Sequence, residues 1–281
     1  MIEQQYLRFT IIIIIFISII SGFLSYFVIR YQFYVWELFI DSKIVALMLL
    51  LFFLYKKKAI QLSNVKLLLL SWNWKRNILY FFFPLILFAI VIASGVLSKE
   101  ISLNKLDNTT TLILATLFDI PAVFVFSATS ILIEEIFFRG FILSTIQPLR
   151  SQLRATMLTS LLWVVYSISE IIGLEEIDAL KFITITLFFF SIGTFCSILV
   201  GKYKLIWFGY SLRVGLITLS PIILTSLLSE TDSFFTTKSF LFYTEGIVFS
   251  TLILFGSFIL YRDIQKISAP MQEKFEIRNF P

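Results

Sequence analysis

Long apolar runs separated by short polar or charged stretches make up most of this 281-residue chain. A helix needs about 20 predominantly apolar residues to cross the hydrocarbon core of a membrane, which is about 30 Å thick. Eight runs predict eight membrane helices: about 9–29, 38–55, 78–98, 112–147, 154–168, 182–200, 205–228 and 241–261. The pattern therefore predicts an all-α, polytopic membrane protein in which residues 1–281 form a single transmembrane helical domain.

Polar and charged residues indicate where several of these helices end. Three consecutive lysines follow the second run at 56–58, and the polar stretch 99–111 reads as a short loop. Pro121 deprives the fourth helix of a hydrogen bond and predicts a tilt or kink there. The polar tail 262–281 is too short for a further domain, and we expect it to be cytoplasmic.

The composition agrees with a membrane protein and excludes several kinds of site. Hydrophobic residues make up 58% of the chain and charged residues 15%, far from an ordinary soluble domain. Histidine is absent and Cys196 is the single cysteine, so a metal site would depend on carboxylates alone, a poor match to zinc. We therefore expect no metal and no other cofactor.

The distribution of basic residues predicts the orientation in the membrane. With eight spans, 15 of the 23 lysines and arginines fall on the side of the termini and 6 on the other. Cytoplasmic loops carry the excess of such residues, so both termini should be cytoplasmic, in a multi-pass protein of the cell membrane. The same asymmetry, together with anionic lipid, explains the net charge of +5 without a nucleic-acid partner.

Three charged residues lie inside one apolar stretch, Ile131 to Leu143. A charge near a bilayer centre costs about 2.5–3.5 kcal/mol on insertion scales, so Glu134, Glu135 and Arg139 need partners or a function. Glu135 and Arg139 are four residues apart with the acid first, which favours an ion pair on one helix face. Glu134 points about 100° away around the helix and is left without that partner.

This stretch resembles the first motif of the membrane-embedded CAAX-protease and bacteriocin-processing family, Glu-Glu-x-x-x-Arg followed by Gly. Glu134-Glu135-x-x-x-Arg139-Gly140 matches it residue for residue, and the resemblance extends over about 112–228. It implies a CAAX-protease-like helical bundle and an intramembrane endopeptidase. In such enzymes the first Glu acts with a His of a Phe-x-x-x-His motif to activate water, while a second His and an Asn stabilise the oxyanion.

The chain departs from this family at every histidine position. Trp163-Val164-Val165-Tyr166-Ser167 stands where Phe-x-x-x-His is expected, which puts Ser167 at the first His and makes Trp163 a packing residue. Arg213 occupies the position of the second His, and Ile217 that of the Asn. Ser167 cannot replace a histidine in acid–base catalysis, because its hydroxyl does not change charge near neutral pH.

Arg213 could form a structural ion pair with Glu134, because a permanent cation inside a membrane bundle needs an acidic partner. A retained ligand-binding cavity and residual hydrolysis, with Arg213 donating to an oxyanion, are the alternatives. If hydrolysis remains, Glu134 is the candidate catalytic residue.

The missing histidines argue against catalysis, although they leave enzyme activity open. The sequence favours a pseudoprotease that binds or scaffolds a membrane-associated peptide, or a membrane or cell-wall partner protein. Its alternatives are an active endopeptidase of the CAAX or bacteriocin-processing type that uses Glu134, a bacteriocin self-immunity protein, and a transporter that uses the buried charges.

Overall fold

A helix lies within each of the apolar runs in the computed structural model. The structure describes residues 2–30, 42–56, 72–103, 124, 128–149, 151–172, 179–222, 228–229, 235–237 and 246–278. The helices are α1 (Ile2–Arg30), α2 (Ser42–Lys56), α4 (Trp74–Leu97), α6 (Leu143–Ile146), α7 (Gln152–Ile172), α8 (Ala179–Tyr203), α9 (Trp207–Ile222) and α10 (Ile247–Arg278). Helical residues 128–135 and the π-helical segment η2 (Ile136–Ile142) lead into α6, and the 3-10 turn η3 (Gln147–Leu149) follows it.

The predicted all-helical membrane class is confirmed, while the number of crossings stays a prediction. Three helices of the described chain are long and apolar enough to cross a bilayer: Trp74–Leu97, Phe182–Tyr203 and Ile247–Ile264. Two shorter apolar helices, Tyr6–Ile20 and Ile44–Lys56, belong to α1 and α2. The predicted kink at Pro121, like the lysines after Lys56, lies outside the described residues.

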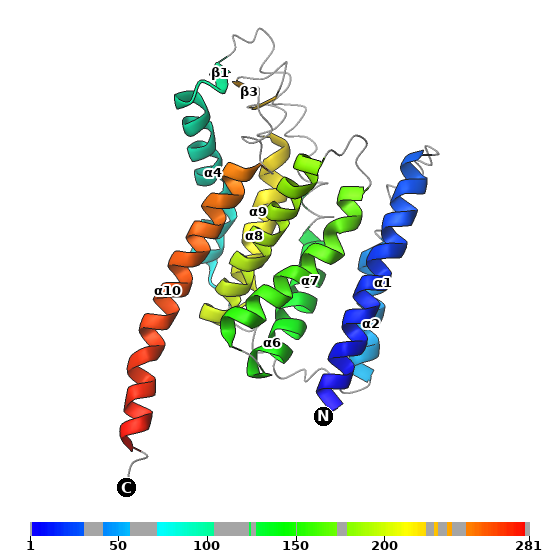
Figure 1. Cartoon of the computed structure of the whole chain (residues 1–281), viewed down its shortest axis with the longest axis vertical. Helices are drawn as coiled ribbons and strands as arrows, with labels where there is room; N and C mark the ends of the chain where they lie inside the picture. Colours follow the sequence, from blue (N-terminus) through cyan, green and yellow to red (C-terminus); the bar gives the residue numbers. More distant parts are fainter. Residues whose placement is uncertain are drawn as a thin grey trace.

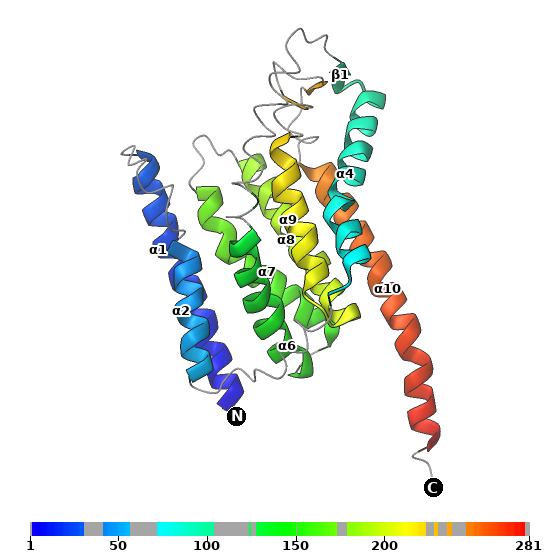
Figure 2. The same ribbon diagram turned by 180° about the vertical axis from the view of Figure 1, so that it is seen from behind.

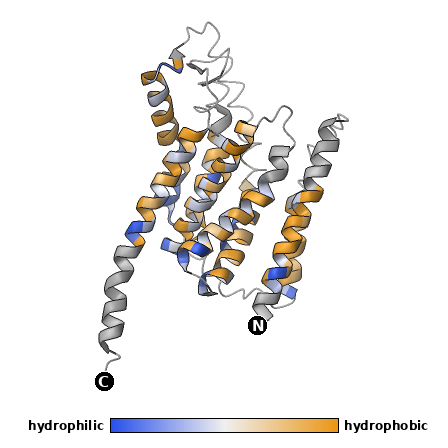
Figure 3. Cartoon of the chain, viewed as in Figure 1, coloured by the Kyte–Doolittle hydropathy of each residue, from blue (hydrophilic) through white to orange (hydrophobic). Residues whose placement is uncertain are grey.

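The helices form a bundle with α8 and α9 inside it (Figures 1 and 2). α8 packs against α7, α9 and α10, and 72% of its membrane-length window is buried, compared with 28% for α4 and 22% for the span of α10. α1 and α2 lie side by side at one edge, where α1 packs on α7. Helix α8 therefore forms the centre. Large apolar side chains are exposed on the outer helices, which are mostly hydrophobic (Figure 3), as a lipid environment allows.

A small sheet at one end of the bundle corrects two sequence-based predictions. Strand β1 (Ile101–Leu103) pairs antiparallel with β3 (Phe235–Thr237), which pairs parallel with β2 (Leu228–Ser229). The predicted loop 99–111 thus begins with a strand, and the predicted helix 205–228 ends in one. These strands are too short to give a period, and their partners lie far away in the sequence, so no local pattern predicts them.

The start of α1 and the end of α10 lie at the opposite end from this sheet (Figure 1). α10 continues through Arg278, so most of the polar segment 262–281 is helical. Helix α4 also begins at the end of the bundle that holds the two termini, beside the end of α8 and the start of α9 (Figure 2). There Trp72 meets Trp207 with 4.8 Å between ring centroids.

Backbones approach closely where glycine replaces a side chain. A Cβ atom on Gly215 of α9 would lie 2.0 Å from the carbonyl oxygen of Phe81 in α4, so α4 and α9 touch backbone to backbone. A Cβ on Gly193 of α8 would lie 2.9 Å from Cε3 of Trp163 in α7. These contacts bring α4 close to α9, and α7 close to α8, in the interior of the bundle.

Candidate functional site

Glu134 and Glu135 end a regular helical turn, and η2 starts directly after them. In a π-helix each carbonyl bonds five residues ahead, which widens the turn and often marks a functional position. Ser144 and Thr145 donate to the carbonyl oxygen of Phe141 over 2.9 and 2.8 Å, which satisfies backbone at the end of the segment. The wide turn carries Arg139 into the bundle, where it is completely buried.

Four charged side chains meet in the bundle interior. Arg139 Nη1 lies 3.2 Å from Glu135 Oε1, so the motif's acid and base form an ion pair across one turn. Arg213 of α9 reaches both acids: its Nη1 lies 3.0 Å from Glu135 Oε1, and its Nη2 donates to Glu134 Oε2. Two carboxylates and two guanidinium groups make this cluster neutral, and we call Glu134, Glu135, Arg139 and Arg213 the four-charge cluster.

Trp163 of α7 forms one wall of this cluster. Its Nε1 donates to Glu134 Oε2 over 3.1 Å, and the Cζ atoms of Arg139 and Arg213 lie 4.9 and 4.6 Å from its ring centroid. A guanidinium over an indole gains cation–π attraction that grows when water is excluded. Sequence reasoning treated Trp163 as a packing residue and missed this role. The available signal was that a buried indole N–H needs an acceptor.

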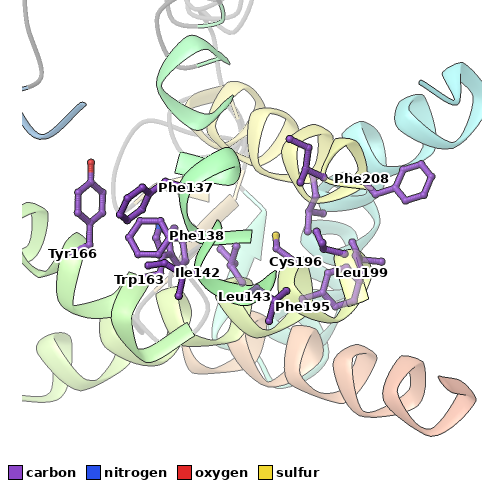
Figure 4. Packing of buried hydrophobic residues seen from close by; sticks show 14 of the residues in the cluster. Phe137, Phe138, Ile142, Leu143, Trp163, Tyr166, Phe195, Cys196, Leu199 and Phe208 are labelled. Carbon is purple, nitrogen blue, oxygen red and sulfur yellow. The ribbon is translucent and has the colours of Figure 1, made fainter. Parts of the chain in front are cut away.

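Packing around the cluster explains how it fits among apolar side chains. Figure 4 shows buried hydrophobic residues of this region, among them Phe138, Ile142 and Trp163 close to one another and Phe195 and Cys196 of α8, all members of one hydrophobic core. A Cβ on Gly209 of α9 would lie 3.2 Å from Glu135 Oε2 and from the Cβ of Cys196. Glycine at this position therefore lets α9 come close enough for Arg213 to reach the acids.

Part of the cluster's hydrogen-bonding capacity is unused among the described residues. Arg139 Nη2 donates to the carbonyl oxygen of Gly193 over 3.5 Å, but Arg139 Nε and Glu135 Oε2 are buried without a hydrogen-bond partner there. Hydrogen bonds alone thus satisfy these groups only partly, and the ion pairs compensate for their burial.

Ser167 and Ile217, the other two residues at predicted motif positions, are not members of the four-charge cluster. Ser167 is buried on α7, one turn after Trp163, and it is Trp163 that contacts Glu134 from this helix. Ile217 on α9 is 36% exposed, one turn beyond the buried Arg213. In the part of the chain that the structure describes, no group of three or more His, Cys, Asp or Glu residues could hold a metal ion.

The chemistry of the four-charge cluster suits buried ion pairing better than acid–base catalysis. A general base must accept a proton and later return it, but Glu134 Oε2 already accepts hydrogen bonds from Arg213 and Trp163. Arginine keeps its proton in proteins, so Arg213 cannot replace a histidine as acid or base. What it can do is donate hydrogen bonds to both carboxylates at once.

Comparison with known proteins shows what this core is similar to. A family model described as type II CAAX prenyl endopeptidase Rce1-like matches residues 115–216. The match includes the four-charge cluster, Trp163 and Ser167, and it ends one residue before Ile217. No curated protein and no solved structure gives a significant match.

Proposed function

We propose that this chain belongs to the Rce1-like family of type II CAAX prenyl endopeptidases, which its residues 115–216 resemble, and that it is a pseudoprotease that binds or scaffolds a membrane-associated peptide or partner protein. One observation carries the proposal: Arg213, at the position of the second family histidine, is bonded to both Glu134 and Glu135. The acids that would activate water instead serve as counter-ions.

The residues around Glu134 support this reading. Its partner across the α7 interface is the Nε1 of Trp163, which donates a hydrogen bond but cannot take up a proton. With no histidine in the chain, proton transfer from a water held by Glu134 would lack the second group on which the family relies. A binding role needs none of these steps.

Direct assay separates a pseudoprotease from an active endopeptidase. The full-length protein, reconstituted in lipid nanodiscs, is mixed with a prenylated CAAX peptide, and both cleavage and binding are measured. We expect binding without a cleavage product, and binding per folded molecule unchanged in Glu134→Gln. Glu100→Gln, in the turn that follows α4, is the matched control.

A cleavage product that disappears in Glu134→Gln, while Glu100→Gln retains it, would replace the pseudoprotease with an active enzyme. Absence of both cleavage and peptide binding would remove the peptide-binding role. Protection of cells against a bacteriocin would point instead to self-immunity.

We further propose that both termini are cytoplasmic in the cell membrane. The basic ends of the described helices support this orientation. Lys56 ends α2, Arg76 and Arg154 lie in the first turns of α4 and α7, and these helix ends lie toward the end of the bundle that holds the termini (Figures 1 and 2). Lys202 lies in the last turn of α8 and pairs with Asp263, which follows Arg262. Single cysteines introduced at Lys56 and Arg262 should label only after the cells are permeabilised, with Cys196 buried and unreactive as the background. Labelling of either position in intact cells would reverse the orientation.

A further inference from the structure

Two glycines of α8 fix how this helix faces α7. A Cβ on Gly193 would lie 3.3 Å from the Cβ of Ser160, and a Cβ on Gly201 would lie 2.7 Å from Nε2 of Gln152. The residue numbers rise along α7 where they fall along α8, so the two helices run antiparallel. Residues 152–160 of α7 therefore lie along residues 193–201 of α8, and we call this contact the α7–α8 seam.

Thr156 and Ser197 occupy the middle of the α7–α8 seam. Thr156 lies four residues from each of the two contact residues of α7, and Ser197 lies four residues from each of the two glycines. Because residues four apart share a helix face, the two side chains face each other at the same level of the bundle. They are only 1% and 0% exposed. The middle of the seam thus holds two small hydroxyl side chains that lipid does not reach.

Neither of these hydroxyl groups has a hydrogen-bond partner among the described residues. Other buried serines bond a carbonyl oxygen one turn earlier in their own helix: Ser160 donates to Thr156 and Ser257 donates to Ile253, both over 2.8 Å. The Nε2 of Gln152 is likewise buried without a partner in the described part of the chain. Two hydroxyl groups and one amide donor are therefore unpaired within one short stretch of the seam.

The chemistry of these three groups indicates the ligand that they fit. An amide nitrogen only donates, whereas a hydroxyl both donates and accepts, so the ligand must do both as well. Buried water does this, and it typically makes about three hydrogen bonds to polar groups that are otherwise unsatisfied. Threonine and serine leave more room between two helices than the leucine or phenylalanine of an ordinary core. Gln152 is half-buried in the first turn of α7, so water can enter from the end of the bundle that holds the termini.

We propose that a water molecule is bound in the α7–α8 seam by Gln152, Thr156 and Ser197. The water accepts a hydrogen bond from Nε2 of Gln152 and bridges Oγ1 of Thr156 and Oγ of Ser197. It joins α7 to α8 through groups that form no direct bond with each other. The site does not depend on whether the four-charge cluster is catalytic.

The position of this site gives the water a route toward the four-charge cluster. Ser197 is four residues from Gly193, a distance of about 6 Å along α8 at 1.5 Å per residue. The carbonyl oxygen of Gly193 accepts a hydrogen bond from Nη2 of Arg139 over 3.5 Å. The bound water therefore lies between the end of the bundle that holds the termini and the buried charges.

Water-to-protein magnetisation transfer in solid-state NMR tests the proposal. The full-length protein, with isotope-labelled threonine and serine, is reconstituted in lipid vesicles. We expect a water cross-peak at the Cβ atoms of Thr156 and Ser197, assigned with Thr156→Val and Ser197→Ala. Ser257 is the matched control, because its hydroxyl is equally buried but bonded within its own helix, and it should show no such cross-peak.

Thr156→Val should also remove the water cross-peak of Ser197, because the water loses one of its partners. Thr156→Ser keeps the hydroxyl and should retain that cross-peak, a difference that a general loss of packing does not produce. The proposal is overturned if neither residue shows a cross-peak in the native protein, or if Ser257 shows an equal one. A Ser197 cross-peak that survives in Thr156→Val would also overturn it.

Discussion

Removing Arg213 is the perturbation that most directly tests the four-charge cluster. Arg213→Gln takes away one of two guanidinium groups and leaves two buried carboxylates on adjacent residues. Arg139 would remain 3.2 Å from Glu135, while Glu134 would keep only the hydrogen bond from Trp163. The variant therefore buries one uncompensated negative charge.

The size of the effect follows from the contacts that are lost. Breaking a buried ion pair by removing one partner commonly costs about 3–5 kcal/mol, and Arg213 contacts two acids, so we expect the upper end of that range. Glu134→Gln/Arg213→Gln restores neutrality and should recover at least about 2 kcal/mol of it. The stability of Arg213→Lys should lie between that of the native protein and that of Arg213→Gln. Lysine keeps the positive charge, but its single ammonium group lacks the forked guanidinium that reaches both carboxylates.

The free energy of unfolding, measured by chemical denaturation in one detergent, provides the readout for the double-mutant cycle. Arg154→Gln, which changes an exposed arginine, serves as the control and should stay within about 0.5 kcal/mol of the native protein. A coupling energy below about 0.5 kcal/mol between Glu134 and Arg213 would refute the reasoning, because residues in one buried network do not act additively.

Two further substitutions test the packing that holds the cluster. Trp163→Phe keeps a ring beside the guanidinium groups but loses the donor to Glu134, so thermal denaturation should show a loss of about 1.5–3 kcal/mol; an unchanged stability would mean that the bond is not formed. Gly215→Ala forces a Cβ against the Phe81 carbonyl and should cost about 1–3 kcal/mol or more in folded yield and stability. Gly140→Ala, whose nearest neighbours would be 3.8 Å away, is the matched control, and equal losses in both would contradict the close approach of α4 and α9.

The sequence predicts the helices well because the apolar runs are long and their boundaries are charged. In the site, the spacing of Glu135 and Arg139 predicts their contact, since residues four apart share a helix face. Arg213 could be matched to Glu134 because a buried cation requires an acid. The bridge from Arg213 to Glu135 was not predictable, because it depends on the angle at which α9 approaches, and Gly209 permits that approach.

Other features depend on information that a sequence pattern does not carry. The π-helical segment differs from an α-helix by one residue per turn, and nothing in its apolar composition distinguishes the two. The contact of Trp163 with Glu134 joins residues 29 positions apart, and the pairing of Ile101 with Thr237 spans about half of the chain. Such contacts arise from tertiary packing, which local periodicity does not encode.

The length of α10 has a mechanical consequence. Its 32 residues form one continuous helix about 48 Å long, at 1.5 Å per residue, while its apolar span ends at Ile264. About 20 Å of the helix therefore continues past the end of the apolar span as an arm (Figure 2). Within the membrane this helix packs on α8, where Gly256 lies against Phe195. A force on the free end of the arm thereby reaches the central helix of the bundle through α10, and Pro270, which removes one backbone hydrogen bond, is the place where the arm bends most easily.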